Sequence, residues 1–293
     1  MSKPDLTAVG AAFGRASHVL LDDPPFVLED SVSINLVDTD VLRAAQLLTD
    51  DGRLKVTRDD PRAMWRGIFV GRARLVEDCV TERARAGVHQ YVILGAGLDT
   101  FAQRRADLMP QVHVFEVDEP VTQGWKRARL QETGMDMPPN LHFVPVDFET
   151  GASWVEAIAA SGFDRARPTV IASTGVTQYI SAGALRSTLR DAVGLSSGTT
   201  FVSTFVLPAD RIDPGERELR RVTEERAAAR GAPWISFYTP EDIVAMARAA
   251  GFDDVRHVSR EELNDRYFSD RADGLRAPSG EQLMVATRQR VGG

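Results

Sequence analysis

The loop Gly95–Ala96–Gly97 contains the residues whose types and spacing most directly suggest chemistry. It follows the short apolar segment Tyr91–Leu94 and precedes a turn toward a helix. Because glycine has no side chain, backbone N–H groups in such a loop can approach a polar cofactor closely. Ordinary strand–helix turns also contain glycine, so the loop predicts a cofactor site only together with further residues at cofactor spacing.

Acidic residues stand at the ends of the next two apolar segments, at the spacing expected for cofactor contacts. Asp118 lies about twenty residues beyond the glycines, where a ribose-binding carboxylate is expected. Asp147 could accept a hydrogen bond from an adenine amine, and Phe148 could supply an apolar wall or its backbone N–H. Ligands of open parallel sheets bind beyond the carboxyl ends of the strands. We therefore expect an adenosine-containing cofactor over three neighbouring strand ends.

Glu116 is the alternative to Asp118 as the ribose-binding acid. The two residues flank Val117, so on a regular strand both point to the same face. Only Asp118 lies at the strand end where the cofactor is expected. We therefore predict a structural or supporting role for Glu116.

The residues after the glycines favour a cofactor without phosphates. Dinucleotide-binding loops follow the pattern Gly-x-Gly-x-x-Gly, whose third glycine lets a helix N-terminus face a pyrophosphate. Thr100 occupies that third position, after Leu98 and Asp99. We therefore predict S-adenosyl-L-methionine as the cofactor and keep a nicotinamide dinucleotide as the alternative.

The pattern of apolar segments predicts a single α/β domain with a doubly wound, seven-stranded and mostly parallel sheet, because its strands alternate with helices. Residues 1–87 form an N-terminal helical region and residues 88–207 the cofactor-binding core. The polar segment 208–236 is interpreted as a solvated helix, Glu216–Arg230, or as a mobile cover, and residues 237–293 complete the core. The predicted strands are Tyr91–Leu94, Val112–Val117, His142–Val146, Thr169–Ser173, Thr200–Leu207, Asp254–Val258 and Gln282–Thr287. The other predicted helices are Val41–Leu48, Arg62–Ala86, Pro120–Thr133, Ser153–Ser161, Ala182–Val193 and Pro240–Ala250.

Composition limits the classes of function. The chain has 293 residues, 43% of them hydrophobic, and a net charge of −7. This charge gives no basic footprint for nucleic acid or an anionic membrane, and no apolar run approaches the length of a bilayer-spanning helix. The single cysteine, Cys79, allows no internal disulfide, and its apolar neighbours favour a buried thiol over a nucleophile. We expect a cytoplasmic enzyme without a metal site, a nucleic-acid partner or a membrane partner.

Several longer motifs occur along the chain. They are Gly-Ala-Gly-Leu-Asp-Thr100, Phe-Glu-Val-Asp-Glu-Pro120, Trp125-Lys126-Arg127, Val-Pro-Val-Asp-Phe148, Trp234-Ile-Ser-Phe-Tyr-Thr-Pro-Glu-Asp242, Tyr267-Phe268 and Arg271-Ala-Asp-Gly-Leu-Arg276. Together they resemble the leucine carboxyl methyltransferase-like family, most closely its bacterial branch associated with polyketide O-methyltransferases. The resemblance covers nearly the whole chain. It implies a class I, Rossmann-like methyltransferase fold with an antiparallel last strand, an N-terminal helical extension and a substrate-covering insertion.

The resemblance also implies which residues hold each part of the cofactor. Arg72 matches the family arginine that binds the methionine carboxylate, for which a planar guanidinium is suited. A solvated helix arginine is the alternative interpretation, with Arg74 as a similarly charged neighbour. The other matching positions are Gly95 under the methionine portion, Asp118 at the ribose, and Asp147 with Phe148 at the adenine.

The chain departs from the family pattern at Thr174. Many relatives carry a glutamate there, five residues ahead of a tyrosine that this chain keeps as Tyr179. A hydroxyl can form a hydrogen bond but brings no negative charge near the sulfonium. Thr174 is therefore a predicted cofactor contact of altered chemistry, and Tyr179 a predicted substrate contact with packing as the alternative. The other candidates for the acceptor pocket, again with packing as the alternative, are Arg62, Arg66, Trp234, Tyr238, Tyr267 and Arg271.

The predicted activity is O-methylation of a carboxylate or hydroxyl on a small, natural-product type acceptor. Methyl transfer mainly requires alignment and the exclusion of water, and a carboxylate acceptor needs no general base, whereas a phenol does. The five histidines offer no evident base, so we assign no catalytic residue and favour carboxylate methylation. The alternatives are methylation of a protein C-terminal carboxylate and a non-catalytic binding protein, the latter suggested by Thr174. The acceptor's identity and the oligomeric state are left open.

Overall fold

A seven-stranded sheet organises the molecule. The computed structural model describes residues 4–289 apart from 38, 45–46, 54, 56, 58–62 and 148–151. The strands are β1 Gln90–Leu94, β2 His113–Asp118, β3 Leu141–Pro145, β4 Val170–Ser173, β5 Thr200–Val206, β6 Asp254–Val258 and β7 Glu281–Thr287. Their order is β3-β2-β1-β4-β5-β7-β6; β7 pairs antiparallel with both β5 and β6, and the remaining pairs are parallel. The doubly wound sheet and the antiparallel last strand are confirmed.

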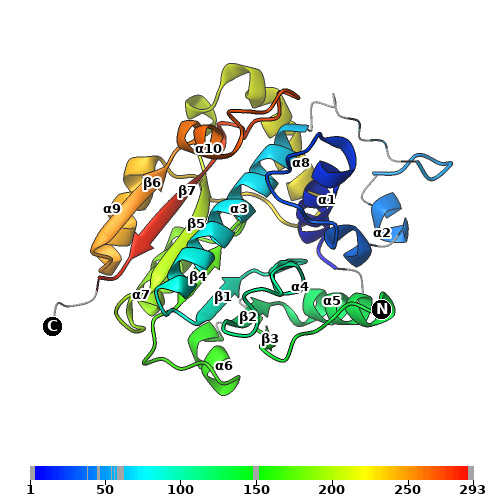
Figure 1. Ribbon diagram of the computed structural model, residues 1–293. Coiled ribbons are helices and arrows are strands. Elements are labelled where there is room, and N and C mark those ends of the chain that lie inside the picture. Colours follow the sequence, from blue (N-terminus) through cyan, green and yellow to red (C-terminus); the bar gives the residue numbers. More distant parts are fainter. Residues whose placement is uncertain are drawn as a thin grey trace.

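Helices cover both faces of this sheet. Figure 1 shows α3 crossing one face of the sheet, and α1 packs against α3. The helices are α1 Leu6–Leu21, α2 Thr39–Ala44, α3 Ala63–Arg85, α4 Phe101–Arg104, α5 Pro120–Glu132, α6 Trp154–Ala160, α7 Ala182–Val193, α8 Arg217–Ala229, α9 Pro240–Ala250 and α10 Arg260–Tyr267. Short 3-10 helices are η1 Ser33–Leu36, η3 Thr177–Tyr179, η4 Ala209–Arg211 and η5 Pro214–Glu216.

Alternation along each strand supplies the two halves of the core. In β1, the side chains of Tyr91 and Ile93 join the apolar cluster under α3 and α10. Val92 and Leu94 join the cluster on the other face, under α6, α7 and α9. Successive side chains of a strand point to opposite faces, so a strand covered on both sides is buried throughout. This explains why the central strands are continuous apolar runs in the sequence.

A third apolar cluster attaches the N-terminal region to the core. It joins Val9 and Phe13 of α1 to Leu36 of η1 and to Trp125 and Leu130 of α5. The indole Nε1 of Trp125 also donates a hydrogen bond to the carbonyl of Leu36 at 3.0 Å. These contacts fix α1 against α5, beside the carboxyl end of the sheet.

The predicted helices differ from the observed ones mainly in the N-terminal and C-terminal regions. The predicted helix Val41–Leu48 begins earlier, at Thr39, and α2 ends at Ala44, while Leu48 forms an isolated bridge. Arg62, the predicted start of the next helix, lies outside the described residues. Helix α10 was not predicted because it carries almost no apolar pattern: only Leu263 is buried.

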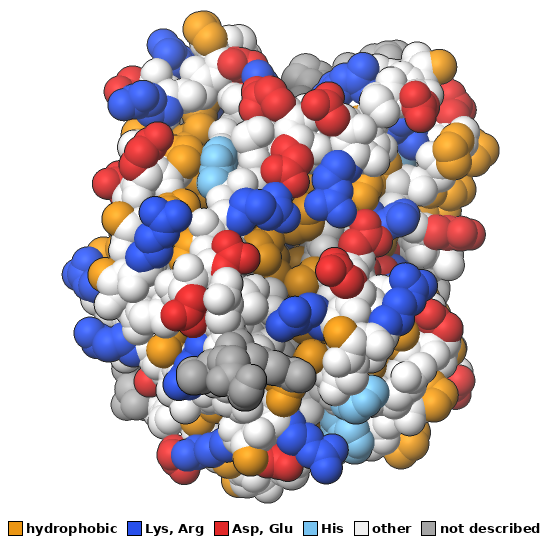
Figure 2. Space-filling model, turned by 60° about the vertical axis from the view of Figure 1, so that its left-hand side comes forward, with side chains coloured by type: hydrophobic (Ala, Val, Ile, Leu, Met, Phe, Trp, Pro, Cys, Tyr) orange, Lys and Arg blue, Asp and Glu red, His pale blue; other side chains and the backbone are white. Residues whose placement is uncertain are grey.

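The surface mixes charges of both signs. Figure 2 shows one face on which basic and acidic side chains are interspersed, with hydrophobic side chains between them. Within the described part of the chain, no helix is both long and apolar enough to cross a membrane.

Candidate active site

A cavity of about 790 Å³ lies beyond the carboxyl ends of β1, β2 and β4, enclosed by α1, α3 and α8. It borders the point between β1 and β4 where the strand order reverses, which is where open α/β sheets bind ligands. Its size is within the usual range for small-molecule sites. The sequence-predicted residues that line it are Arg66, Arg72, Gly95, Ala96, Gly97, Asp118, Thr174, Tyr179 and Trp234.

The glycine loop forms one wall of this cavity. Gly95 and Gly97 have φ angles of +69° and +53°, a backbone region that residues with a Cβ rarely adopt. A Cβ built on Gly95 would lie 2.5 Å from Cγ2 of Val176. The loop therefore requires glycine at Gly95 for both its conformation and its contact with the loop after β4.

Asp118 closes the loop from the end of β2. Its Oδ2 accepts a hydrogen bond from the N–H of Gly97 at 2.5 Å, and its Oδ1 accepts one from the N–H of Glu119 at 2.7 Å. Burial raises the pKa of this carboxyl, and the two N–H donors oppose that rise. A carboxylate has about four acceptor sites, so Asp118 keeps acceptors for the hydroxyls of a ribose.

Glu116 lies two residues deeper, in a buried ion pair. Its Oε2 is 2.5 Å from Nζ of Lys126, and both side chains are 1% exposed or less. Burial raises the pKa of Glu116 to about 7, against the opposing effect of Lys126. Glu116 is not among the described residues that line the cavity. This placement agrees with the structural role predicted for it.

A buried network that the sequence reasoning missed holds the far end of the loop. Asp30 is fully buried and accepts hydrogen bonds from Nε of Arg15 at 2.8 Å and from the hydroxyl of Thr100 at 2.7 Å. Arg15 also donates to the carbonyl of Leu98 at 2.7 Å. Arg104, from α4, lies 3.5 Å from Asp30. Nothing in the spacing of these residues signals the network, because they come from three separate segments.

Thr100 also bears on the choice of cofactor. Its side chain is fully buried between Asp30 and Arg104. The helix that follows, α4, has only four residues. The loop therefore lacks the third glycine, and the helix after it is too short to present a long N-terminus to a pyrophosphate. Both features disfavour a nicotinamide dinucleotide.

Arg72 reaches the cavity from α3. It is 8% exposed, its Nη1 donates to Oε1 of Glu281 at 2.7 Å, and its guanidinium lies over the ring of Phe69, 4.8 Å from the centroid. Arg74 instead pairs with Asp78 and is 43% exposed. It is not among the described residues of the lining. The geometry therefore favours Arg72 over Arg74 as the cavity arginine.

Thr174, Tyr179 and Trp234 lie on the wall formed by the loop after β4 and the chain after α8. The rings of Tyr179 and Trp234 meet edge to face, with centroids 6.4 Å apart. Burial raises the pKa of the Tyr179 hydroxyl. Tyr179 and Trp234, two of the predicted acceptor contacts, thus face the same cavity as the predicted cofactor contacts.

The polar segment 208–236 contains the predicted helix, and that helix covers the cavity. Leu219, Thr223 and Arg226 of α8 and Arg230, which caps the helix, line it, so the segment is both a surface helix and a cover. Whether the cover moves stays a prediction. Arg220 anchors it: the guanidinium lies 4.6 Å from the centroid of the Trp234 ring.

Three further predicted acceptor residues, Tyr238, Tyr267 and Arg271, are not among the described residues that line the cavity. The ring of Tyr238 belongs to the apolar core. The hydroxyl of Tyr267 donates to Asp78 at 2.8 Å, and Arg271 donates to the carbonyls of Asp23 and Pro25. The geometry therefore supports packing roles for these three residues. Arg66 does line the cavity, but both its Nε and its Nη2 bind Asp22.

The adenine contacts are less well defined. Asp147 is exposed just after β3 and is not among the described lining residues. Phe148 lies outside the described residues. Their roles stay predictions.

The histidines and the cysteine lie away from the cavity. All five histidines are described, and none of them lines it. His18 is buried with its Nδ1 2.8 Å from Asp22. Burial raises the pKa of the Cys79 thiol to about 11, and Cys79 packs against the core. The side chain is only partly buried, so the predicted burial of the thiol holds in part.

Comparison with known proteins identifies the family. Residues 8–193 match the sequence profile described as leucine carboxyl methyltransferase. The chain belongs to this family. A Bacillus subtilis relative named "Putative S-adenosyl-L-methionine-dependent methyltransferase YktD" is 27% identical over 293 residues, covering 94% of this chain and 95% of the relative. A Frankia alni relative with the same description is 30% identical over 260 residues, covering 84% and 81%. Their descriptions name the cofactor predicted from the sequence.

Solved structures confirm the class I methyltransferase fold of this leucine carboxyl methyltransferase family member. A protein from Thermobifida fusca superposes with a TM-score of 0.57 at 18% identity, covering 99% of this chain and 97% of that one. The S-adenosylmethionine-dependent methyltransferase SibL gives a TM-score of 0.50 at 16% identity, covering 77% and 58%. At these identities the likeness concerns the fold alone.

Proposed function

We propose that this protein is an S-adenosyl-L-methionine-dependent O-methyltransferase that acts on a carboxylate or hydroxyl of a small molecule, with a carboxylate favoured. The observation that carries the proposal is the single cavity that collects a glycine loop, a strand-end carboxylate and a buried arginine from three elements. We further propose a natural-product acceptor of the polyketide type and a cytoplasmic location.

The residues present fit the cofactor part by part. Gly95 and Gly97 leave the backbone of the loop accessible, Asp118 offers acceptors to the ribose, and Arg72 offers donors to the methionine carboxylate. When bound, S-adenosyl-L-methionine supplies a methyl carbon activated by a sulfonium. The cover helix α8 and the aromatic pair Tyr179–Trp234 exclude water from this space and orient the acceptor.

The cover helix supports an anionic acceptor. Arg226, in the last turn of α8, and Arg230, the residue that caps this helix, lie four positions apart, and both line the cavity. No residue of the described chain forms an ion pair or side-chain hydrogen bond with either guanidinium. Two such cations at the cavity wall suit a carboxylate, and an acceptor carboxylate is ionised at neutral pH. The absence of histidine from the described lining agrees with chemistry that needs no general base.

Calorimetry and an activity screen test the proposal. S-adenosylhomocysteine should bind the purified protein saturably, whereas NAD⁺ should not. A screen with isotopically labelled methyl donor, small carboxylic acids, phenols and C-terminal peptides should show base-labile methyl esters on small acids. Binding of NAD⁺ instead would overturn the cofactor assignment. Methylation restricted to phenols would overturn the carboxylate preference, and binding without transfer to any acceptor would favour the non-catalytic alternative suggested by Thr174.

A further inference from the structure

The Arg72–Glu281 pair offers opposite charges on one wall of the cavity. Both residues line it, and they are 8% and 6% exposed. Only one contact joins them, from Nη1 of Arg72 to Oε1 of Glu281 at 2.7 Å. In the part of the chain that the structure describes, no residue forms a hydrogen bond with Oε2 of Glu281 or with Nη2 of Arg72. One acceptor and one donor therefore remain for a ligand in the cavity.

The topology explains why a residue so late in the chain reaches this site. β7 is antiparallel to β5, and Glu281, its first residue, pairs with Val206, the last residue of β5. An antiparallel strand thus starts at the edge where the parallel strands end. Glu281 also lies beyond residues 8–193, the part that matches the family profile.

Two other carboxylates of the cavity lining have partners of their own. Glu77 binds Arg104, and Asp118 is held by two backbone N–H groups. Thr174 carries no charge. Its neighbour Gly175 lies close to Arg72, because a Cβ added to Gly175 would lie 3.0 Å from Nη2 of Arg72. Glu281 is the carboxylate in direct contact with Arg72.

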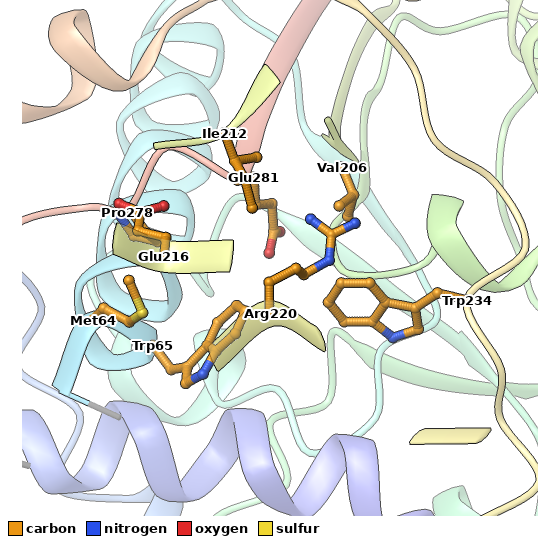
Figure 3. Close-up of a pocket in the computed structure, with 10 residues that line it drawn as sticks. Met64, Trp65, Val206, Ile212, Glu216, Arg220, Trp234, Pro278 and Glu281 are labelled. Atoms are coloured by element: carbon orange, nitrogen blue, oxygen red, sulfur yellow. The ribbon is translucent and has the colours of Figure 1, made fainter. Parts of the chain in front are cut away.

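Glu281 also lines a second, much smaller space, which Figure 3 shows. The Glu281 carboxylate and the Arg220 guanidinium point toward the same small space beside Trp234. That space measures only about 10 Å³, so it cannot hold a ligand. The open side of Glu281 is therefore the large cavity.

We propose that Glu281 binds the ammonium group of the cofactor's methionine tail while Arg72 binds its carboxylate. The inference rests on the proposed function and deepens it. A buried arginine–glutamate pair is the charge complement of an α-amino acid zwitterion, because each charge of the ligand meets the opposite charge of the protein. Hydrogen bonds between charged groups contribute more than those between neutral ones. Thr174 therefore need not be acidic for the tail to be neutralised.

A purely positioning role for Glu281 makes a different prediction. If Glu281 only orients Arg72, its charge matters solely for ligands that carry the tail carboxylate. If Glu281 binds the ammonium, its charge also matters for a ligand that keeps the ammonium and lacks the carboxylate. Decarboxylated S-adenosylhomocysteine is such a ligand, and 5′-methylthioadenosine lacks both groups.

The experiment is calorimetry on wild type and Glu281→Gln with these three ligands. Glutamine keeps the shape and an acceptor for Arg72, and thermal unfolding checks that the variant folds. We expect Glu281→Gln to bind S-adenosylhomocysteine and its decarboxylated form about ten- to hundredfold more weakly, and 5′-methylthioadenosine unchanged. Thr174→Glu added to Glu281→Gln should restore part of the loss, because it returns a charge beside the Arg72 guanidinium. Glu216→Gln, a neighbouring carboxylate outside the described lining of the large cavity, is the matched control and should leave all three affinities unchanged.

Two results would overturn the inference and leave the proposed function intact. One is wild-type affinity of Glu281→Gln for S-adenosylhomocysteine. The other is a loss for S-adenosylhomocysteine with unchanged affinity for the decarboxylated form, which would make Glu281 a positioning residue for Arg72. Failure of the wild-type protein to bind any of the three ligands would instead contradict the proposed function itself.

Discussion

The backbone N–H of Gly97 donates a hydrogen bond to Oδ2 of Asp118 at 2.5 Å, which joins the loop after β1 to the end of β2. The carboxylate thereby orders the loop while it faces the cavity. One residue thus shapes the loop and offers acceptors to a ligand. Loss of the Asp118 charge should weaken ligand binding both directly and by loosening the loop.

Asp118→Asn should weaken binding of S-adenosylhomocysteine by about tenfold or more, because charged hydrogen bonds contribute roughly 1.5–3 kcal/mol. The asparagine amide also offers only one oxygen, whereas two backbone N–H groups point at the carboxylate. Calorimetry measures the effect, with the exposed Asp136→Asn as a control that should bind normally. Unchanged affinity in Asp118→Asn would remove Asp118 from the ribose site.

Gly95→Ala should destabilise the protein by about 1–3 kcal/mol, the usual cost of forcing a residue with a Cβ into a left-handed conformation. The new Cβ would also lie 2.5 Å from Val176. Urea denaturation measures the free energy of unfolding. Gly124→Ala is the matched control, because Gly124 lies inside α5 with no atom within 4 Å of its added Cβ. That substitution should be neutral or stabilise the helix; equal effects at the two positions would contradict the strained loop.

The Asp30 network should make the free energy of unfolding depend on pH in the acidic range. Burial would raise the pKa of Asp30, but Arg15, Arg104 and the Ser33 hydroxyl hold it well below its usual range. A carboxyl whose folded pKa is depressed stabilises the fold above its unfolded pKa of about 3.9, and that contribution is lost as the pH falls toward the folded pKa. The free energy of unfolding should therefore fall between about pH 5 and pH 3.

Urea denaturation at a series of pH values checks this expectation. Asp30→Asn should be less stable than wild type at pH 7 and should lose less stability on acidification. Asp265→Asn, an exposed substitution, should follow the wild-type curve. Parallel pH profiles for wild type and Asp30→Asn would show that Asp30 does not carry the acid dependence.

Removal of the two cavity arginines at the end of α8 should impair use of anionic acceptors. The double change Arg226→Ala and Arg230→Ala should raise KM for a carboxylate acceptor by about tenfold, since an ionic hydrogen bond contributes roughly 1.5–3 kcal/mol. The affinity for S-adenosylhomocysteine should stay unchanged. Arg221→Ala serves as the control, because Arg221 lies on the same helix paired with Glu218 and Glu225. An unchanged KM in the double variant would exclude these arginines from acceptor binding.

Local patterns predicted the sheet and several of the residues that line the cavity. Each strand is a short apolar run because both faces are buried, and Gly97 and Asp118 stand at strand ends, where chain order places them together. The helices near the termini were harder to predict. α10 buries only Leu263, so its position depends on tertiary contacts and capping by Ser259 rather than on an apolar face.

Long-range pairings were the part that the sequence could not predict. Glu281 meets Arg72 across 209 positions, and Asp30 meets Thr100 across 70. No spacing rule links such residues. The antiparallel direction of the last strand could have indicated Glu281, because an antiparallel β7 begins at the edge of the sheet where the parallel strands end. Tyr267 and Arg271 were proposed from motif identity alone, and the structure shows them bound to Asp78 and to backbone carbonyls instead.

A crystal structure with S-adenosylhomocysteine tests the central claim most directly. The account predicts the ligand in the cavity between α1, α3 and the ends of β1, β2 and β4, with the ribose hydroxyls on Asp118 and the tail carboxylate on Arg72. An empty cavity at saturating ligand, or a ligand bound elsewhere with Asp118 and Arg72 untouched, would contradict it.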